Sequence, residues 1–153
     1  MEDRLRALEE RVRAHIPLAA HLGFRLERHQ PGELILHAPL EPNINDKGTF
    51  FAGSQAALLA LAGWALTTLE AEGTLDRADV VAVESSLKHL APAPFDARLE
   101  ARATGAALER FHERLARRGR GKLELQVELL GPAGERATTY QGLYMARQLE
   151  EGE

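Results

Sequence analysis

The stretch from Pro39 to Leu69 contains most of the residues whose types and spacing could support chemistry. A polar loop in this stretch runs directly into a helix. The polar and glycine residues of the loop and of the helix start are Asn43, Asn45, Asp46, Gly48, Thr49, Gly53 and Ser54. Backbone N–H groups at a helix start have no partner within the helix and attract negative charge. The pattern therefore predicts a ligand site at the helix start, where the amides around Gly53 could polarise a carbonyl group as an oxyanion hole.

Side chains of the loop offer two further roles. Asn45 could orient a water molecule or a substrate amide, and Asp46 could act as a general base. Turn and helix-cap hydrogen bonds are the alternative for both asparagines, since asparagine forms them routinely. The two interpretations stay open for Asn45. The turn interpretation is favoured for Asn43, and a solvated turn is favoured for Asp46.

Glu84 is the other candidate acid. It follows the apolar run Val80–Val83 and precedes Ser85 and Ser86. A carboxylate in a buried strand needs a partner or takes a raised pKa, and both states are typical of functional sites. The favoured alternative is a solvent-facing position on an alternating strand.

The helix after the loop is apolar on every face. Between Ala56 and Leu69, the only polar side chains are those of Thr67 and Thr68. A surface helix keeps one polar stripe, so the pattern predicts a helix that is wrapped by other structure. Phe50–Leu69 also has about the 20-residue length of a membrane-spanning helix, but its polar start and the strands around it favour a buried helix.

Alternation of apolar and polar residues predicts an antiparallel sheet with one buried and one wet face. The alternation is clearest in Phe95–Thr104 and Lys122–Leu129. The other expected strands are Phe24–His29, Glu33–Ala38, Asp79–Leu90 and Arg136–Arg147, and the other expected helices are Glu2–His15, Pro17–Gly23 and Ala106–Arg118.

The order of these elements predicts a single α+β domain that spans residues 1–153. An antiparallel sheet wrapped around one long central helix, with an N-terminal helix and a helical insert, is the hotdog fold. The open sheet edges of such a fold predict at least a homodimer, or a dimer of dimers, in which each site is completed by the neighbouring chain.

Composition excludes several classes of protein and site. The 153 residues include no cysteine, which excludes disulfides, thiolate metal sites and a cysteine nucleophile. The net charge of −4 argues against a nucleic-acid partner. No histidine pair has the spacing of a metal site, and His29 and His112 are expected at the surface, so neither metal nor cofactor is predicted. The N-terminal segment lacks the apolar core of a signal peptide, which predicts a cytoplasmic protein with no membrane partner.

The run PLEPNINDKGTFFAGSQAALLALAGWAL, which begins at Pro39, resembles the hotdog thioesterase domain that is fused behind an N-acetyltransferase in some bacterial proteins. The similarity extends over most of the chain, from Ile16 to Arg147. The resemblance implies an acyl thioester as the small-molecule ligand.

Hotdog thioesterases share a pattern in which an Asn and a Gly precede a His-Gly-Gly at the helix start, with an acid two turns further on. Asn45, Gly48 and Gly53 match this pattern. Phe51 stands in the place of the histidine, and Ala60 stands in the place of the acid. Hydrolysis of this type uses a carboxylate as nucleophile or as base, so the resemblance supports a thioester-sized site more strongly than it supports hydrolysis.

The resemblance and the loop together predict a thioesterase that hydrolyses an acyl-CoA or acyl-carrier thioester. The predicted catalytic residues are Asn45, Asp46, Gly53 and Glu84, and the predicted substrate-binding residues are Asn43, Gly48, Thr49, Phe51, Ser54 and Leu58. A channel lined by Phe51, Leu58 and Leu61 would hold the acyl chain. The alternative is a non-catalytic hotdog protein that binds acyl-CoA or a similar pantetheine-type ligand, and the missing acid favours this alternative.

Overall fold

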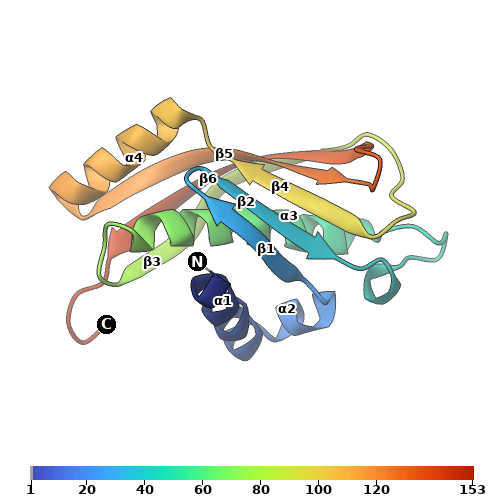
Figure 1. Cartoon of the computed structure of the whole chain (residues 1–153), viewed down its shortest axis with the longest axis horizontal. Coiled ribbons are helices and arrows are strands. Elements are labelled where there is room, and N and C mark those ends of the chain that lie inside the picture. Colours follow the sequence, from blue (N-terminus) through green and yellow to red (C-terminus); the bar gives the residue numbers. More distant parts are fainter. Residues whose placement is uncertain (1) are drawn as a thin grey trace.

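Six strands form one antiparallel sheet around a central helix in the computed structural model, which describes residues 2–153 (Figure 1). The order across the sheet is β1-β2-β4-β5-β6-β3, and each neighbouring pair is antiparallel. In chain order the strands are β1 (Arg25–Gln30), β2 (Glu33–Ala38), β3 (Ala78–His89), β4 (Ala97–Arg102), β5 (Arg120–Leu130) and β6 (Arg136–Gln148). This is the α+β hotdog arrangement that the sequence predicts.

Helix α3 (Ala52–Glu72) is the centre of the core. Leu58 and Leu66 on this helix are fully buried. Gly63 allows β6 to approach closely, because a Cβ atom at this position would lie 2.6 Å from the hydroxyl of Tyr144. By length and composition α3 could cross a membrane, but in this fold the sheet wraps around it as the sequence predicts.

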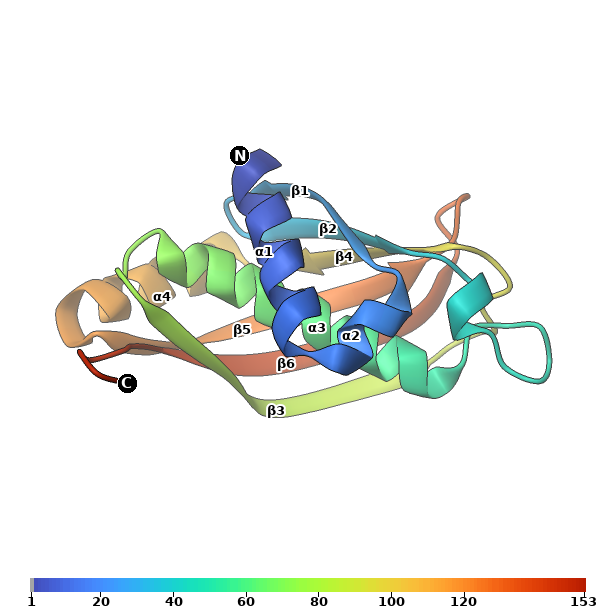
Figure 2. The same ribbon diagram turned by 90° about the horizontal axis from the view of Figure 1, so that it is seen from below.

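Besides the 3-10 helix η1 (Glu41–Asn43), three further α-helices pack on the sheet and on α3. They are α1 (Glu2–His15), α2 (Pro17–Leu22) and α4 (Gly105–Arg118). Figure 2 shows α1 and α2 lying over α3 on the side that the sheet leaves open. Because α1 is amphipathic, it buries Leu5, Leu8 and Val12 and leaves its charged residues in solvent.

Strand β4 is shorter than the alternation of Phe95–Thr104 predicts. It ends at Arg102, because Thr104 instead caps helix α4 with a hydroxyl that accepts the N–H of Ala107 at 3.1 Å. At the other end of β4, the ring of Phe95 lies over Gly131. Helix-cap chemistry thus takes precedence over the strand pattern at this boundary.

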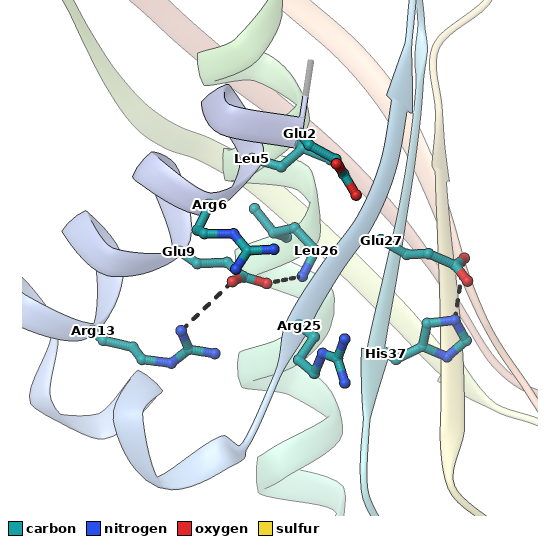
Figure 3. A pocket seen from close by; sticks show the side chains of 9 residues that line it. All are labelled: Glu2, Leu5, Arg6, Glu9, Arg13, Arg25, Leu26, Glu27 and His37. Carbon is teal, nitrogen blue, oxygen red and sulfur yellow. Dashed lines mark hydrogen bonds and ion pairs between the residues drawn. The ribbon is translucent and has the colours of Figure 1, made fainter.

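The β1 edge of the sheet is covered by α1. The carboxylate of Glu9 accepts the N–H of Leu26, and Arg13 donates to the carbonyl of Phe24 at 2.6 Å. Glu9 and Arg13 line a groove of about 680 Å³ between α1 and β1. Figure 3 shows their side chains between these two elements. These side chains hold α1 against the strand edge, and no residue of the predicted site lines the groove. We therefore interpret the groove as a packing interface between α1 and β1.

The opposite edge, β3, has a different environment. Within the described chain β3 pairs only with β6. Val81 and Val83 in its middle are 45% and 46% exposed. A long apolar strand edge of this kind can pair with another chain.

Candidate functional site

Asn45 closes the loop that leads into α3. Its Oδ1 atom accepts the N–H of Lys47 at 2.9 Å and the N–H of Thr49 at 3.0 Å. Its Nδ2 atom donates to the hydroxyl of Thr49 at 2.9 Å. Gly48 lies inside this turn with a φ of 79°, a conformation that favours glycine. Asn45, Gly48 and Thr49 therefore give the loop its shape, and any role of Asn45 toward a ligand would depend on the same geometry.

The structure separates the other two polar residues of the loop. Asn43 is buried, and its Nδ2 atom donates to the carbonyls of Leu22 and Pro39, both at 2.9 Å. Asp46 lies at the loop tip with 82% of its side chain exposed and pairs with Lys47 at 3.0 Å. Asn43 thus ties the loop to the end of α2, as the turn interpretation expects, whereas Asp46 faces solvent.

The start of α3 is open to solvent. Phe51 occupies the N-cap position in an extended conformation, and within residues 2–153 no side chain caps this helix end. The amides of Ala52, Gly53 and Ser54 therefore keep the partial positive charge of a free helix start. The ring of Phe51 is 53% exposed and folds over Gly53, where a Cβ atom would lie 2.4 Å from the ring. The ring of Phe51 therefore lies against Gly53 at the surface.

A chain of uncharged polar groups begins in the first turn of α3. Gln55 is buried, and its Nε2 atom donates to the carbonyl of Phe50 at 3.1 Å. The hydroxyl of Thr138 donates to Oε1 of Gln55. The same Thr138 oxygen lies 3.4 Å from Nδ1 of His89. These three residues were not predicted to lie together, although Gln55 directly precedes the apolar run Ala56–Leu69 and a buried glutamine there needs polar partners.

An apolar groove of about 310 Å³ lies beside α3. Its lining includes Leu18 and Leu22 of α2, Ala57, Leu61 and Trp64 of α3, and Ala82 of β3. Of the three residues expected along an acyl channel, only Leu61 lines this groove. Leu58 is in the core without exposed surface, so in the single chain a ligand has no access to it.

Glu84 lies on the face of the sheet that is directed away from α3. It pairs with Leu143 of β6, whereas the neighbouring Gly142 and Tyr144 are buried on the inner face. A β-bulge between Ala82 and Glu84 shifts the strand register at this point. Glu84 is exposed, as the solvent-facing alternative expects, and the structure does not bring it together with the loop.

The other end of α3 carries a buried acid, Glu70, that is not among the predicted site residues. Glu70 is 6% exposed, and its carboxylate accepts hydrogen bonds from Nε2 of His29 at 2.9 Å, Nε2 of His112 at 3.0 Å and the N–H of Gly32 at 2.8 Å. The expectation of a surface position is therefore wrong for His29, which is buried against Glu70, whereas His112 keeps 33% of its side chain exposed at its contact with Glu70.

Electrostatics at Glu70 reflect two opposed effects. Burial by itself would raise the pKa of this carboxyl, but the hydrogen bonds from His29, Gly32 and His112 hold the pKa below its ordinary value. Glu70 is therefore an ionised carboxylate at neutral pH with donors on both oxygens. Among residues 2–153, no group of His, Asp and Glu side chains has the arrangement of a metal site.

The antiparallel sheet around one central helix, with a loop that leads into the uncapped helix start, defines the hotdog class of proteins. The family model described as "Putative thioesterase (yiiD_Cterm)" matches residues 5–148. The chain therefore belongs to this family.

Crystal structures of bacterial proteins agree with this assignment. A "putative thioesterase" from Shewanella oneidensis is 27% identical, with a TM-score of 0.82 over 96% of this chain and 99% of the other. A Chlorobaculum tepidum protein of unknown function is also 27% identical, with a TM-score of 0.83 over 97% and 96% of the two chains. A "probable thioesterase" from Pseudomonas aeruginosa is 26% identical, with a TM-score of 0.75 over 94% and 95%. Family and neighbours support a general thioesterase function.

Proposed function

We propose that this protein hydrolyses an acyl thioester of coenzyme A or of an acyl carrier protein. The observation that carries the proposal is the uncapped, exposed start of α3, which lies directly after the loop closed by Asn45. A thioester carbonyl at this helix end would receive the free amides around Gly53. These amides would stabilise the oxyanion that forms when water attacks the carbonyl carbon.

The apolar groove beside α3 is the proposed site of the acyl chain. Gly53, Ala57 and Leu61 follow one another at intervals of four residues, so they lie along one face of the helix. Ala57 and Leu61 line the groove, which places Gly53 on the same helix face one turn before it. An acyl chain in the groove would thus direct its carbonyl toward the helix start.

The proposed functional unit is a homodimer formed through the β3 edges of two copies. The exposed Val81 and Val83 support this proposal, because pairing would cover them and the open edge together. Light scattering should then give twice the 16.8 kDa mass of the chain. Val83→Lys should yield a monomer, whereas Gln30→Lys on the β1 edge should remain dimeric. A wild-type monomer at micromolar concentration would contradict the proposal.

The proposed hydrolysis is tested with a panel of acyl-CoA and acyl-carrier thioesters of increasing chain length. Release of free thiol is measured with a thiol-reactive dye, and binding is measured in parallel by calorimetry. We expect steady thiol release from at least one member of the panel. Binding without thiol release would instead favour a non-catalytic protein that holds the thioester.

That second function is favoured by one specific observation. The first turns of α3 carry no acid in the position where hotdog thioesterases have one, and Ala60 stands there. The next acid on the helix is Glu70, whose carboxylate is already bonded to three donors. A hydrolase with this helix therefore needs a base from another element.

A further inference from the structure

We infer that His89 is this base, and that Thr138 and Gln55 position it; the inference rests on the proposed hydrolysis. The two acids suggested by the sequence fit the role poorly in the single chain. Asp46 is largely exposed at the loop tip, and Glu84 lies on the far face of the sheet. His89 is the last residue of β3. It lies on the sheet face that is directed toward α3, and it is exposed.

Strand register brings His89 to the start of the central helix. His89 at the end of β3 pairs directly with Thr138 of β6, so both side chains leave the sheet on the same face. Thr138 is fully buried and contacts Gln55 in the first turn of α3. Gln55 in turn donates its backbone N–H to the carbonyl of Phe51, the N-cap residue. Two side chains therefore separate the imidazole from the free amides of the helix.

The hydrogen bonds that link Gln55, Thr138 and His89 determine which nitrogen of the His89 imidazole carries the proton. Nε2 of Gln55 donates to the carbonyl of Phe50, so the amide oxygen of Gln55 faces Thr138. The single hydroxyl proton of Thr138 is donated to that oxygen. The hydroxyl oxygen can then only accept from His89, which requires a proton on Nδ1. A neutral imidazole with a proton on Nδ1 carries its free lone pair on Nε2.

This lone pair gives His89 the capacity to activate water. Nε2 takes a proton from water while the water oxygen forms a bond to the thioester carbonyl carbon, and the carbonyl π electrons move to the oxygen near the helix amides. When the tetrahedral intermediate collapses, the C–S bond breaks and the thiolate leaves. The imidazolium returns its proton to sulfur, so water and thioester become a carboxylic acid and a thiol. Thr138 and Gln55 are uncharged, so they fix the tautomer without exchanging a proton.

The first test compares His89→Ala with His15→Ala, which removes an exposed histidine at the end of α1. Loss of a general base should lower kcat by about 100- to 10,000-fold, whereas His15→Ala should leave it unchanged. Added imidazole should restore part of the activity of His89→Ala, because the exposed site can admit it. A purely structural role of His89 would give no such rescue.

The pH dependence of kcat/KM gives a second reading of the same variants. Histidine is the side chain that ordinarily changes charge between pH 5 and 8, and the base is active only when neutral. Wild-type kcat/KM should therefore fall on acidification, because a protonated imidazole cannot take a proton from water. The residual activity of His89→Ala should lack this fall.

The positioning role of Thr138 is tested with an isosteric change and a conservative one. Thr138→Val removes the hydroxyl that holds Nδ1 of His89 and should lower kcat by roughly tenfold, the equivalent of one hydrogen bond. Thr138→Ser should retain activity. Nitrogen-15 NMR should find the proton of neutral His89 on Nδ1 in the wild type.

The possible outcomes separate the base assignment from the proposed function. If the wild type releases no thiol from any thioester, both are overturned. If the wild type turns over and folded His89→Ala retains that turnover, only the base assignment is overturned. A proton on Nε2 of neutral His89 would also overturn the assignment, even in an active enzyme.

Discussion

The two ends of helix α3 carry polar groups that serve opposite purposes. At the start, the amides around Gly53 are free, and an uncharged chain from Gln55 leads to an exposed imidazole. At the end, Glu70 has the charge that catalysis by a carboxylate requires, but three donors occupy it. The difference shows that a charged group can be fully occupied by its own partners, whereas the proposed reactive end is the one whose amides remain available to a ligand.

Glu70 joins three parts of the chain that are far apart in sequence. His29 belongs to β1, Gly32 to the turn after it, and His112 to α4. His112 is further held by Thr74, whose hydroxyl lies 3.0 Å from its Nδ1 atom. The acid therefore secures the C-terminal end of the core, and its removal should affect stability more than chemistry.

The largest expected effect comes from Glu70→Ala. This change leaves the buried donors of His29 and Gly32 and the half-buried donor of His112 without an acceptor, and it should lower the free energy of unfolding by about 3–5 kcal/mol. Denaturant unfolding measures the loss. The matched control is Glu72→Ala, which removes only a surface pair with Arg11 and should cost about 1 kcal/mol or less. Equal losses in the two variants would contradict the structural role of Glu70.

Acidification should lower the stability that Glu70 contributes at the C-terminal end of α3. Because the pKa of Glu70 is lowered in the folded state, its contribution to stability is present at neutral pH. The contribution is lost as the pH falls below about 4.3, the ordinary carboxyl pKa of glutamate, and through the lowered value. The stability difference between wild type and Glu70→Gln should therefore shrink on acidification. A difference that grows below this pH would contradict the sign.

Asn45→Ala tests the opposite end of the helix. Loss of the contacts to Lys47 and Thr49 should open the loop and misplace any ligand beside the helix start. We expect kcat to fall about 100-fold, since a misplacement of about 1 Å costs that much. Asp46→Asn is the comparison, because its exposed side chain should be dispensable if His89 is the base. A fall in kcat for Asp46→Asn alone would return the role of base to Asp46.

A smaller effect is expected where a glycine of the helix lies in the core. Gly63→Ala would press a methyl group against buried Tyr144, and overpacking of this kind costs about 1–3 kcal/mol. Gly53→Ala would displace only the exposed ring of Phe51 and should leave the free energy of unfolding nearly unchanged. Thermal unfolding of the two variants makes the comparison. A Gly63→Ala variant as stable as the wild type would show that the Tyr144 side chain can move to make room for the methyl group.

The fold could be predicted because its signals are local. A few neighbouring residues are enough to show the strand alternation in Lys122–Leu129 and the apolar helix in Ala56–Leu69. Together these two patterns permit few arrangements of the sheet and the helix. The side of Glu84 could not be predicted, since the bulge after Ala82 changes the register without a signature in the sequence.

The polar clusters required knowledge of pairing between distant segments. About forty residues of sequence separate His29 from Glu70, and about forty more separate Glu70 from His112. Because charged residues neighbour both histidines in the sequence, a surface position was predicted for them. A usable signal was the position of Glu70 directly after the apolar run Ala56–Leu69, because a buried charge needs partners. Similarly, His89 and Thr138 meet only through strand register.

The most direct test of the reactive helix start is the turnover of Gly53→Val, measured beside the wild type with the best thioester of the panel. The valine side chain would occupy the place of the carbonyl oxygen at the helix amides. We predict at least a 100-fold loss of kcat/KM, with a free energy of unfolding within about 1 kcal/mol of the wild-type value. A folded Gly53→Val variant that retains wild-type turnover would contradict the account and move the site away from this end of α3.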